Sequence, residues 1–171
     1  MWGILVMPAI AKAAETPGEG LHFGASGYWI QPFGSGLVSG NRLKGGSGWS
    51  LDLSYQRQHF FIGAELLIAR FGNDDTYSNP VFLGARSGYI FGSNNIAPYV
   101  ALGLGFMGYG GAFDGGSGLG FSSEVGVLLF RSWRLKPSIV AQVNFPAFSL
   151  PRGNGQGASL PWSAVGIRLQ L

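Results

Sequence analysis

Residues 96–106 read Ile-Ala-Pro-Tyr-Val-Ala-Leu-Gly-Leu-Gly-Phe, and this stretch decides the fold. Apolar residues occupy every second position from Ile96 to Phe106, and the residues between them are mostly small. A period of two is typical of a β-strand, in which successive side chains point to opposite faces. The interspersed Gly and Pro residues argue against a helix. The stretch therefore predicts a strand with one apolar face.

The same period recurs along the chain after Gly20. Eight alternating segments follow one another, and their connections alternate between tight and long. Tight gaps lie at 58–59, 93–94 and 132–134, and long ones lie at 32–47, 72–80, 107–118 and 146–160. This arrangement predicts an all-β, up-and-down antiparallel meander. The segments begin their apolar phase at Leu21, Trp49, Phe60, Val81, Ile96, Leu119, Leu135 and Val165.

The composition decides which solvent the apolar phase faces. Only 11% of the 171 residues are charged, against roughly 25% in soluble domains, while 46% are hydrophobic. Apolar residues toward lipid and small or polar residues toward the interior are typical of an outer-membrane β-barrel, which must close because lipid tolerates no free sheet edge. A β-sandwich with an aromatic core is the alternative. The aromatic residues expected near strand ends, as interfacial girdles, are Trp29, Trp49, Tyr55, Tyr89, Phe91, Phe106 and Phe145.

The first 14 residues have the features of an export signal. An apolar stretch from Trp2 to Ala11 is followed by the small-x-small pattern Ala11-Lys12-Ala13. Roughly ten apolar residues are too few for the ~20 that a spanning helix needs. No Lys or Arg precedes the stretch, so we expect Met1 to lie inside a longer signal whose true start is upstream. We assign residues 1–14 to the signal and residues 15–171 to one barrel domain; a buried N-terminal helix is the alternative.

From Leu21 to Leu171 the chain resembles the small eight-stranded outer-membrane barrels of Gram-negative bacteria, the OmpA transmembrane domain and OmpX class. The resemblance rests on the alternating pattern and includes the last segment, Val165–Leu171. In that class the final residue is usually Phe and is recognised by the outer-membrane assembly machinery, whereas this chain has Leu171. The resemblance implies both termini in the periplasm and four long loops outside.

Charged and amide side chains in the middle of the predicted strands fall on the phase opposite to the apolar one. A slip of one residue would turn all of them toward lipid, where each Arg costs roughly 2 to 4 kcal/mol. We therefore expect them to face inward and to form a network across the lumen. Its expected members are Asp52, Glu65, Arg86, Glu124, Gln142 and Arg168.

Symmetric turns predict which members of this network face each other, because residues equidistant from the centre of a hairpin are opposite. The assumed centres lie at 58–59, 75–76, 133 and 155. The expected pairs are Asp52 with Glu65, Glu65 with Arg86, Glu124 with Gln142, and Gln142 with Arg168. An eight-stranded barrel is only wide enough for side chains, so the network predicts a plugged lumen. The alternative is a narrow pathway opened by rearrangement of Glu65 and Arg86.

Other chemistry lacks support in the sequence. There is no Cys, the net charge is only +3, and no run of Lys or Arg exists, which argues against thiolate sites and nucleic-acid binding. Gly103–Gly108 matches the dinucleotide fingerprint, but no helix start follows it to hold a pyrophosphate. We interpret Gly103 and Gly105 as inward residues that make room for neighbours. We predict no cofactor and no metal.

An enzyme must also be considered, because some barrels of this size modify the lipid part of lipopolysaccharide. That chemistry needs a His base beside a Ser and a carboxylate. The only histidines, His22 and His59, fall on the side of the tight turns, away from the outer leaflet. We therefore predict that the chain is not an enzyme.

Taken together, these features predict a monomeric outer-membrane barrel with a structural or surface-contact role. A small-solute pore gated by the lumen charges is the second hypothesis, and a lipid-modifying enzyme is the third. The expected partners are membrane lipid, lipopolysaccharide and the assembly machinery. Guanidinium and ammonium groups bind phosphate oxygens well. The basic residues expected to contact lipopolysaccharide phosphates are Arg42, Lys44, Arg70 and Arg152.

Overall fold

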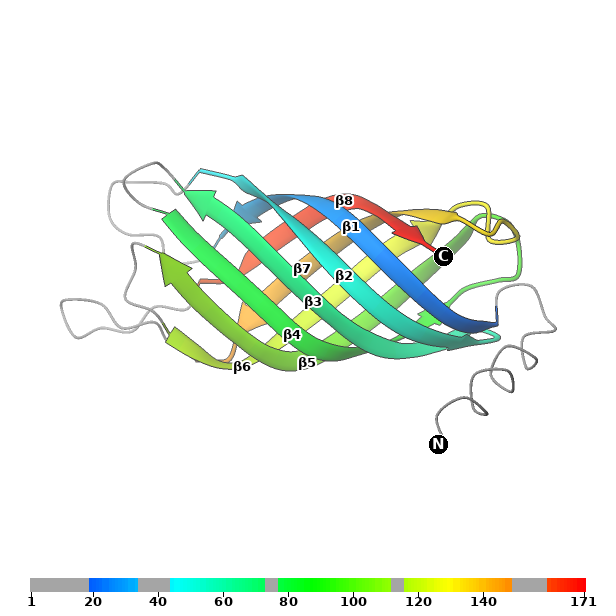
Figure 1. Cartoon of the computed structure of the whole chain (residues 1–171), viewed down its shortest axis with the longest axis horizontal. Helices are drawn as coiled ribbons and strands as arrows, with labels where there is room; N and C mark the ends of the chain where they lie inside the picture. The colour runs from blue at the N-terminus through cyan, green and yellow to red at the C-terminus, as the bar shows by residue number, and fades with distance from the viewer. Residues whose placement is uncertain (1–18, 34–43, 73–76, 112–115, 149–159) are drawn as a thin grey trace, which may run out of the picture.

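A computed structural model describes residues 19–33, 44–72, 77–111, 116–148 and 160–171. Eight strands form a closed antiparallel barrel in chain order (Figure 1), as the sequence predicts. None of the described residues forms a helix long and apolar enough to cross a membrane. The strands are β1 (Gly20–Pro32), β2 (Gly46–Arg57), β3 (Phe60–Gly72), β4 (Tyr77–Ile90), β5 (Ala97–Gly111), β6 (Gly116–Leu128), β7 (Lys136–Pro146) and β8 (Trp162–Gln170).

The barrel closes between its first and last strands. β1 pairs with β8 from Gly24 opposite Gln170 to Pro32 opposite Trp162. Beyond that ladder, Phe23 and Leu171 exchange two backbone hydrogen bonds of 3.1 and 2.9 Å. Closure leaves the sheet without an edge, which is the condition for placing strands in hydrocarbon.

The outer wall carries the large apolar side chains. Exposure alternates strictly along β1 and β2, and the expected apolar phases point outward in all eight strands. Leu102 is 70% exposed, Trp29 65% and Phe60 64%, values that suit contact with lipid rather than water. At the end with the tight turns, Tyr89 packs against Phe60 and Phe91, with ring centroids 4.9 and 5.1 Å apart. This cluster is the kind of aromatic girdle that sits at a membrane interface.

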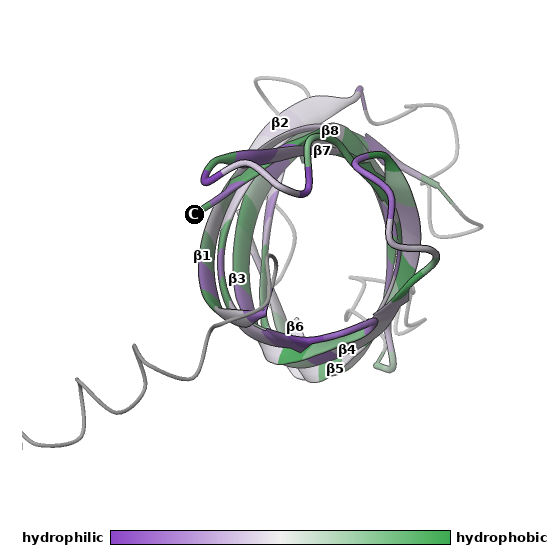
Figure 2. Ribbon diagram, turned by 90° about the vertical axis from the view of Figure 1, so that its right-hand side faces the viewer, coloured by the Kyte–Doolittle hydropathy of each residue, from purple (hydrophilic) through white to green (hydrophobic). Residues whose placement is uncertain are grey.

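The inner wall is layered along the barrel axis, and Figure 2 looks along this axis into the end with the tight turns. An apolar cluster fills the long-loop end of the lumen, and charged side chains lie below it. A smaller apolar cluster on β3–β6 shares the tight-turn end with the buried polar side chains of His22, Gln56 and Lys136. The alternating pattern does not predict these apolar clusters, because the inward phase of the sequence is mostly small or polar. The long-loop layer comprises Tyr28, Ile30, Leu67, Ala69, Phe71, Phe82, Met107, Tyr109, Val140, Leu160, Trp162 and Ala164. The tight-turn layer comprises Phe61, Ile90, Ala97, Tyr99, Ala101 and Leu128.

Inward glycines make this packing possible. The Tyr99 ring lies over Gly126, where a Cβ atom would come within 2.5 Å of the ring carbons. Gly103 lies in the middle of β5, where a Cβ atom would collide with the Ser122 hydroxyl of β6. Gly105 packs against the backbone of Gly84. The fingerprint-like glycines are therefore spacing residues inside a strand, with no phosphate-binding loop around them.

Candidate functional site

Arg168 of β8 is the centre of the charged layer, which we call the lumen belt. Its side chain is inaccessible to solvent. The guanidinium forms a bidentate ion pair with Glu124 of β6, with Nη1 donating to Oε1 at 2.6 Å and Nη2 to Oε2 at 3.0 Å. Nη2 also donates to Oε1 of Glu65 on β3 at 3.1 Å. Bidentate pairs of this kind are among the stronger hydrogen-bonded contacts in proteins.

The Nε side of Arg168 faces β1 and β2. Nε donates to the hydroxyl of Ser26 at 3.0 Å and lies 3.2 Å from Oδ1 of Asp52. The Asp52 carboxylate lies against Gly24, where any Cβ atom would collide with it. The pairing of Asp52 with Arg168 therefore requires a glycine on the neighbouring strand.

Arg86 of β4 is the second cation of the lumen belt. Its Nη1 donates to Oε2 of Glu124 at 3.3 Å and lies 3.9 Å from Oε1 of Glu65. Its guanidinium carbon lies 5.1 Å from the centre of the Phe61 ring. Glu65 and Glu124 each contact both arginines, so removing one cation leaves two carboxylates short of a partner.

Amide and phenol groups complete the lumen belt. Gln142 donates from Nε2 to Oε2 of Glu65 at 3.4 Å and to Oδ1 of Asn144 at 3.2 Å. The hydroxyls of Tyr28 and Tyr99 accept from Arg168 at 3.0 and 3.3 Å. Both tyrosines and Asn144 are additions to the predicted network, although all three lie on the predicted inward phase. All six residues expected in the network are buried and lie in this one layer.

The register agrees with two of the four expected pairs. Asp52 lies opposite Glu65, and Glu124 lies opposite Gln142. Both pairs flank tight turns, whose centres are visible in the sequence.

The two pairs across long loops were predicted incorrectly. Glu65 lies opposite Gly84 rather than Arg86, an offset of two residues. Gln142 lies opposite Ala164 rather than Arg168, an offset of four. Long loops need not be symmetric, so their midpoints do not fix the register. An even offset keeps the side chains on the inward face. The long side chains of the two arginines still reach the carboxylates, although they are not directly opposite them on the neighbouring strand.

The histidines lie at the tight-turn end. His22 Nε2 is 3.4 Å from Nζ of Lys136, and both side chains are buried. His59 stacks on Tyr89, with centroids 5.7 Å apart. In the part of the chain that the structure describes, no group of three His, Asp or Glu side chains is arranged to hold a metal ion.

Two of the four expected lipopolysaccharide contacts, Arg42 and Arg152, lie outside the described residues, as does the expected signal segment 1–14. Lys44 precedes β2 and Arg70 lies near the end of β3, and both are exposed. The Arg70 guanidinium lies 4.7 Å from the centre of the Tyr77 ring. These two cations therefore sit together at the long-loop end.

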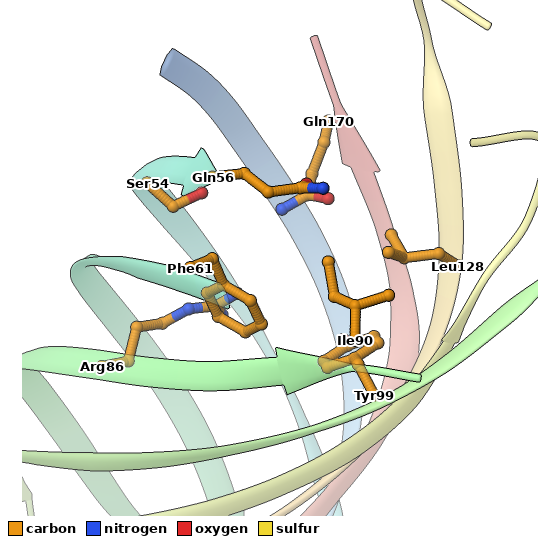
Figure 3. Close-up of a pocket in the computed structure, with 8 residues that line it drawn as sticks. All are labelled: Ser54, Gln56, Phe61, Arg86, Ile90, Tyr99, Leu128 and Gln170. Atoms are coloured by element: carbon orange, nitrogen blue, oxygen red, sulfur yellow. The ribbon is translucent and has the colours of Figure 1, made fainter. Parts of the chain in front are cut away.

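Two surface depressions lie on the outer wall near the long-loop end, and one small cavity lies inside the barrel near the tight-turn end. One outer hollow of about 390 Å³ is lined by Trp49, Ile68, Arg70 and Asn79 among others. A second, of about 420 Å³, shares Asn79 and lies over β4 to β6. The inner cavity is far smaller, about 10 Å³ (Figure 3). Its lining comprises Ser54, Gln56, Phe61, Arg86, Ile90, Tyr99, Leu128 and Gln170.

The barrel is similar to several solved structures. Neisserial surface protein A superposes with a TM-score of 0.69 at 12% identity, covering 88% of this chain and 96% of that one. OprG from Pseudomonas aeruginosa gives 0.53 at 9% identity, covering 90% and 96%. The outer membrane enzyme PagL gives 0.50 at 14% identity, covering 86% and 98%.

These similarities define the class of the protein by its fold. The chain is a small eight-stranded barrel of the outer-membrane type. No family model matches it, and no curated protein sequence does. At these identities the fold alone is shared, and one of the neighbours, PagL, is an enzyme.

Proposed function

We propose that this protein is a structural or surface-contact barrel whose lumen is permanently closed. One observation carries the proposal: a packed apolar layer closes the lumen on the long-loop side of the lumen belt. Arg168 of the lumen belt and Trp162 and Phe82 of the long-loop layer are all fully buried. A continuous water path along the axis would have to cross the packed aromatic side chains of the long-loop layer, whatever its course past the polar groups at the tight-turn end. This arrangement favours a plug over a gated pore.

The proposed location is the outer membrane, with the tight-turn end in the periplasm and the long loops outside. The outward apolar wall and the outer-membrane neighbours support the location. Since a closed barrel has no free edge to pair with another copy, we propose that it acts as a monomer, with membrane lipid as its permanent partner.

Conductance in planar lipid bilayers tests the closed lumen. We expect the refolded chain to give no unitary current steps at neutral pH. We expect the Glu65→Gln variant to give none either. A heat-dependent shift on a gel serves as the control that each sample is folded. Stable steps that disappear or change size in Glu65→Gln or Arg86→Gln would establish the pore hypothesis instead.

Lys44 and Arg70 support a further role at the long-loop end, the binding of lipopolysaccharide phosphates. Both are exposed cations, and Arg70 borders the outer hollow of about 390 Å³ on the lipid-facing wall. A charge-assisted hydrogen bond to phosphate is worth about 1.5 to 3 kcal/mol. In this proposal the two cations together anchor an anionic headgroup.

We expect Lys44→Glu with Arg70→Glu to weaken lipopolysaccharide binding roughly tenfold or more, because each change replaces attraction with repulsion. Labelled lipopolysaccharide in a titration with the refolded barrel measures the effect. Arg57→Glu with Arg134→Glu is the charge-matched control, because these exposed residues lie at the opposite end. Equal losses in both pairs would show that net charge alone matters.

We propose that the protein has no lipid-modifying activity, although PagL shares the fold. His22 is buried against Lys136 and His59 lies in a tight turn, both far along the axis from the long-loop end. Incubation with labelled lipopolysaccharide is expected to leave the lipid unchanged. Conversion that persists in His22→Ala with His59→Ala would point to catalytic residues elsewhere.

A further inference from the structure

One side chain connects the three tight turns of the barrel. Arg131 lies between β6 and β7, and its guanidinium donates from Nη2 to the carbonyl oxygen of Gln58 at 2.7 Å. Nη1 donates to the carbonyl oxygen of Gly92 at 2.9 Å. The backbone N–H of Arg131 donates to the carbonyl oxygen of Asn95 at 3.1 Å. The turn after β6 is thus bonded to the turn after β2 and to the turn after β4.

The topology shows that this contact crosses the mouth of the barrel. In a closed ring of eight strands in chain order, the β2–β3 turn and the β6–β7 turn are four strands apart in either direction. They lie on opposite sides of the opening into which Figure 2 looks. A hydrogen bond between Arg131 and Gln58 therefore spans the opening rather than following the wall.

The backbone is strained at both ends of this contact. Gln58 has φ of 53° and Phe130 has φ of 54°, and they are the two non-glycine residues with positive φ among the described part of the chain. Residues other than glycine rarely adopt a backbone conformation with positive φ unless the surrounding structure imposes it. At Gln58 both backbone groups have distant partners, because its N–H donates to Oε1 of Glu19 at 3.0 Å and its carbonyl accepts from Arg131.

The small cavity lies at the same end of the barrel, and its lining includes Gln56 and Leu128, which precede the β2–β3 and β6–β7 turns. Figure 3 shows Ser54, Gln56 and Gln170 on one side of it and Arg86 at its base. Its volume of about 10 Å³ is sufficient for one water molecule. Nε of Arg86 is buried and has no hydrogen-bond partner within the described residues. A polar floor and a volume of this size are what an ordered water requires.

We propose that residues 129–135 form a lid over the tight-turn mouth, with Arg131 as its latch. While latched, the lid separates bulk water from the cavity and from the Arg86 end of the lumen belt. Loss of the two guanidinium hydrogen bonds lets the strained turns relax, and the cavity then joins the solvent. Because the apolar layer at the long-loop end is unchanged, the opened barrel contains a cavity that is open to solvent at one end only, and it does not become a channel.

Thiol labelling tests the latch, since the chain contains no native cysteine. Ser54→Cys places a buried thiol in the cavity wall. In the refolded, vesicle-embedded chain, we expect a charged methanethiosulfonate reagent to label it roughly tenfold faster when Arg131→Ala is added, because two charged hydrogen bonds are lost. Arg134→Ala, an exposed arginine on the same turn, is the matched control and is expected to leave the rate unchanged.

A second thiol distinguishes a released lid from a loosened barrel. Ser50→Cys lies on β2 on the long-loop side of Asp52 and is also buried, so it is expected to stay unlabelled in Arg131→Ala. Equal Ser54→Cys rates with and without Arg131 would overturn the proposal, and so would labelling of both thiols. If Arg131→Ala fails the heat-shift test for folding, Arg131→Lys takes its place, with an intermediate rate expected and an unchanged rate contradicting the latch.

Discussion

Replacing Arg168 by Met is expected to lower the free energy of unfolding by about 3 to 5 kcal/mol, the usual penalty for removing one partner of a buried ion pair. Arg168 contacts three carboxylates, those of Asp52, Glu65 and Glu124. Without it, Arg86 alone remains to neutralise them in the lumen belt. Met fills a similar volume, so the loss reports charge rather than a cavity. Urea unfolding in lipid vesicles, followed by tryptophan fluorescence, gives the value.

Arg57→Met provides the control for this prediction, because Arg57 is exposed at the end of β2 and has no buried carboxylate to neutralise. We expect it to change stability by less than about 1 kcal/mol, the range of exposed ion pairs. If Arg168→Met were as stable as the control, the lumen belt would have to be hydrated enough to screen its charges. The closed-lumen account would then be wrong.

Replacing Trp162 by Ala is expected to cost about 3 to 5 kcal/mol as well, but for a different reason. Trp162 is the largest fully buried side chain and packs in the apolar layer at the long-loop end. Its removal leaves a cavity that neighbours such as Ile30 and Tyr109 cannot fill. The same unfolding assay measures the loss.

Trp29→Ala is the matched control, because Trp29 is 65% exposed on the lipid-facing wall and its removal creates no internal cavity. We expect a clearly smaller loss. A pore hypothesis makes the opposite prediction for Trp162, since a side chain that lines an aqueous pathway is removed at little cost and with a gain of conductance.

Much of the fold was predictable from the sequence because lipid imposes a simple pattern. The alternation seen in Ile96–Phe106 continues in every strand, and it fixed which side chains face outward. Tight turns left their centres visible, so Asp52 was correctly placed opposite Glu65. The midpoint of a long loop does not reveal the register of the strands that it joins. For this reason the expected positions of Arg86 opposite Glu65 and of Arg168 opposite Gln142 are wrong.

The interior was only partly predictable. Charged and amide side chains in the middle of the strands are few on the inward phase, so phase and residue type together predict the six members of the lumen belt. Inward residues such as Phe82, Met107 and Trp162 are scattered among small residues, and they form a layer only when all strands are brought together. The latch at Arg131 is bonded to residues as far as 73 positions away, and no local signal marks such a contact.

The most direct test of the central claim is to refold the chain into detergent micelles or vesicles and compare unboiled with boiled samples on a gel, with circular dichroism on the same material. We predict a β-sheet spectrum and a mobility that shifts on boiling, as expected for a closed barrel that resists the gel detergent until it is heated. A chain that folds in water without detergent and shows no shift would contradict the account, because its apolar wall would then face a protein core rather than lipid.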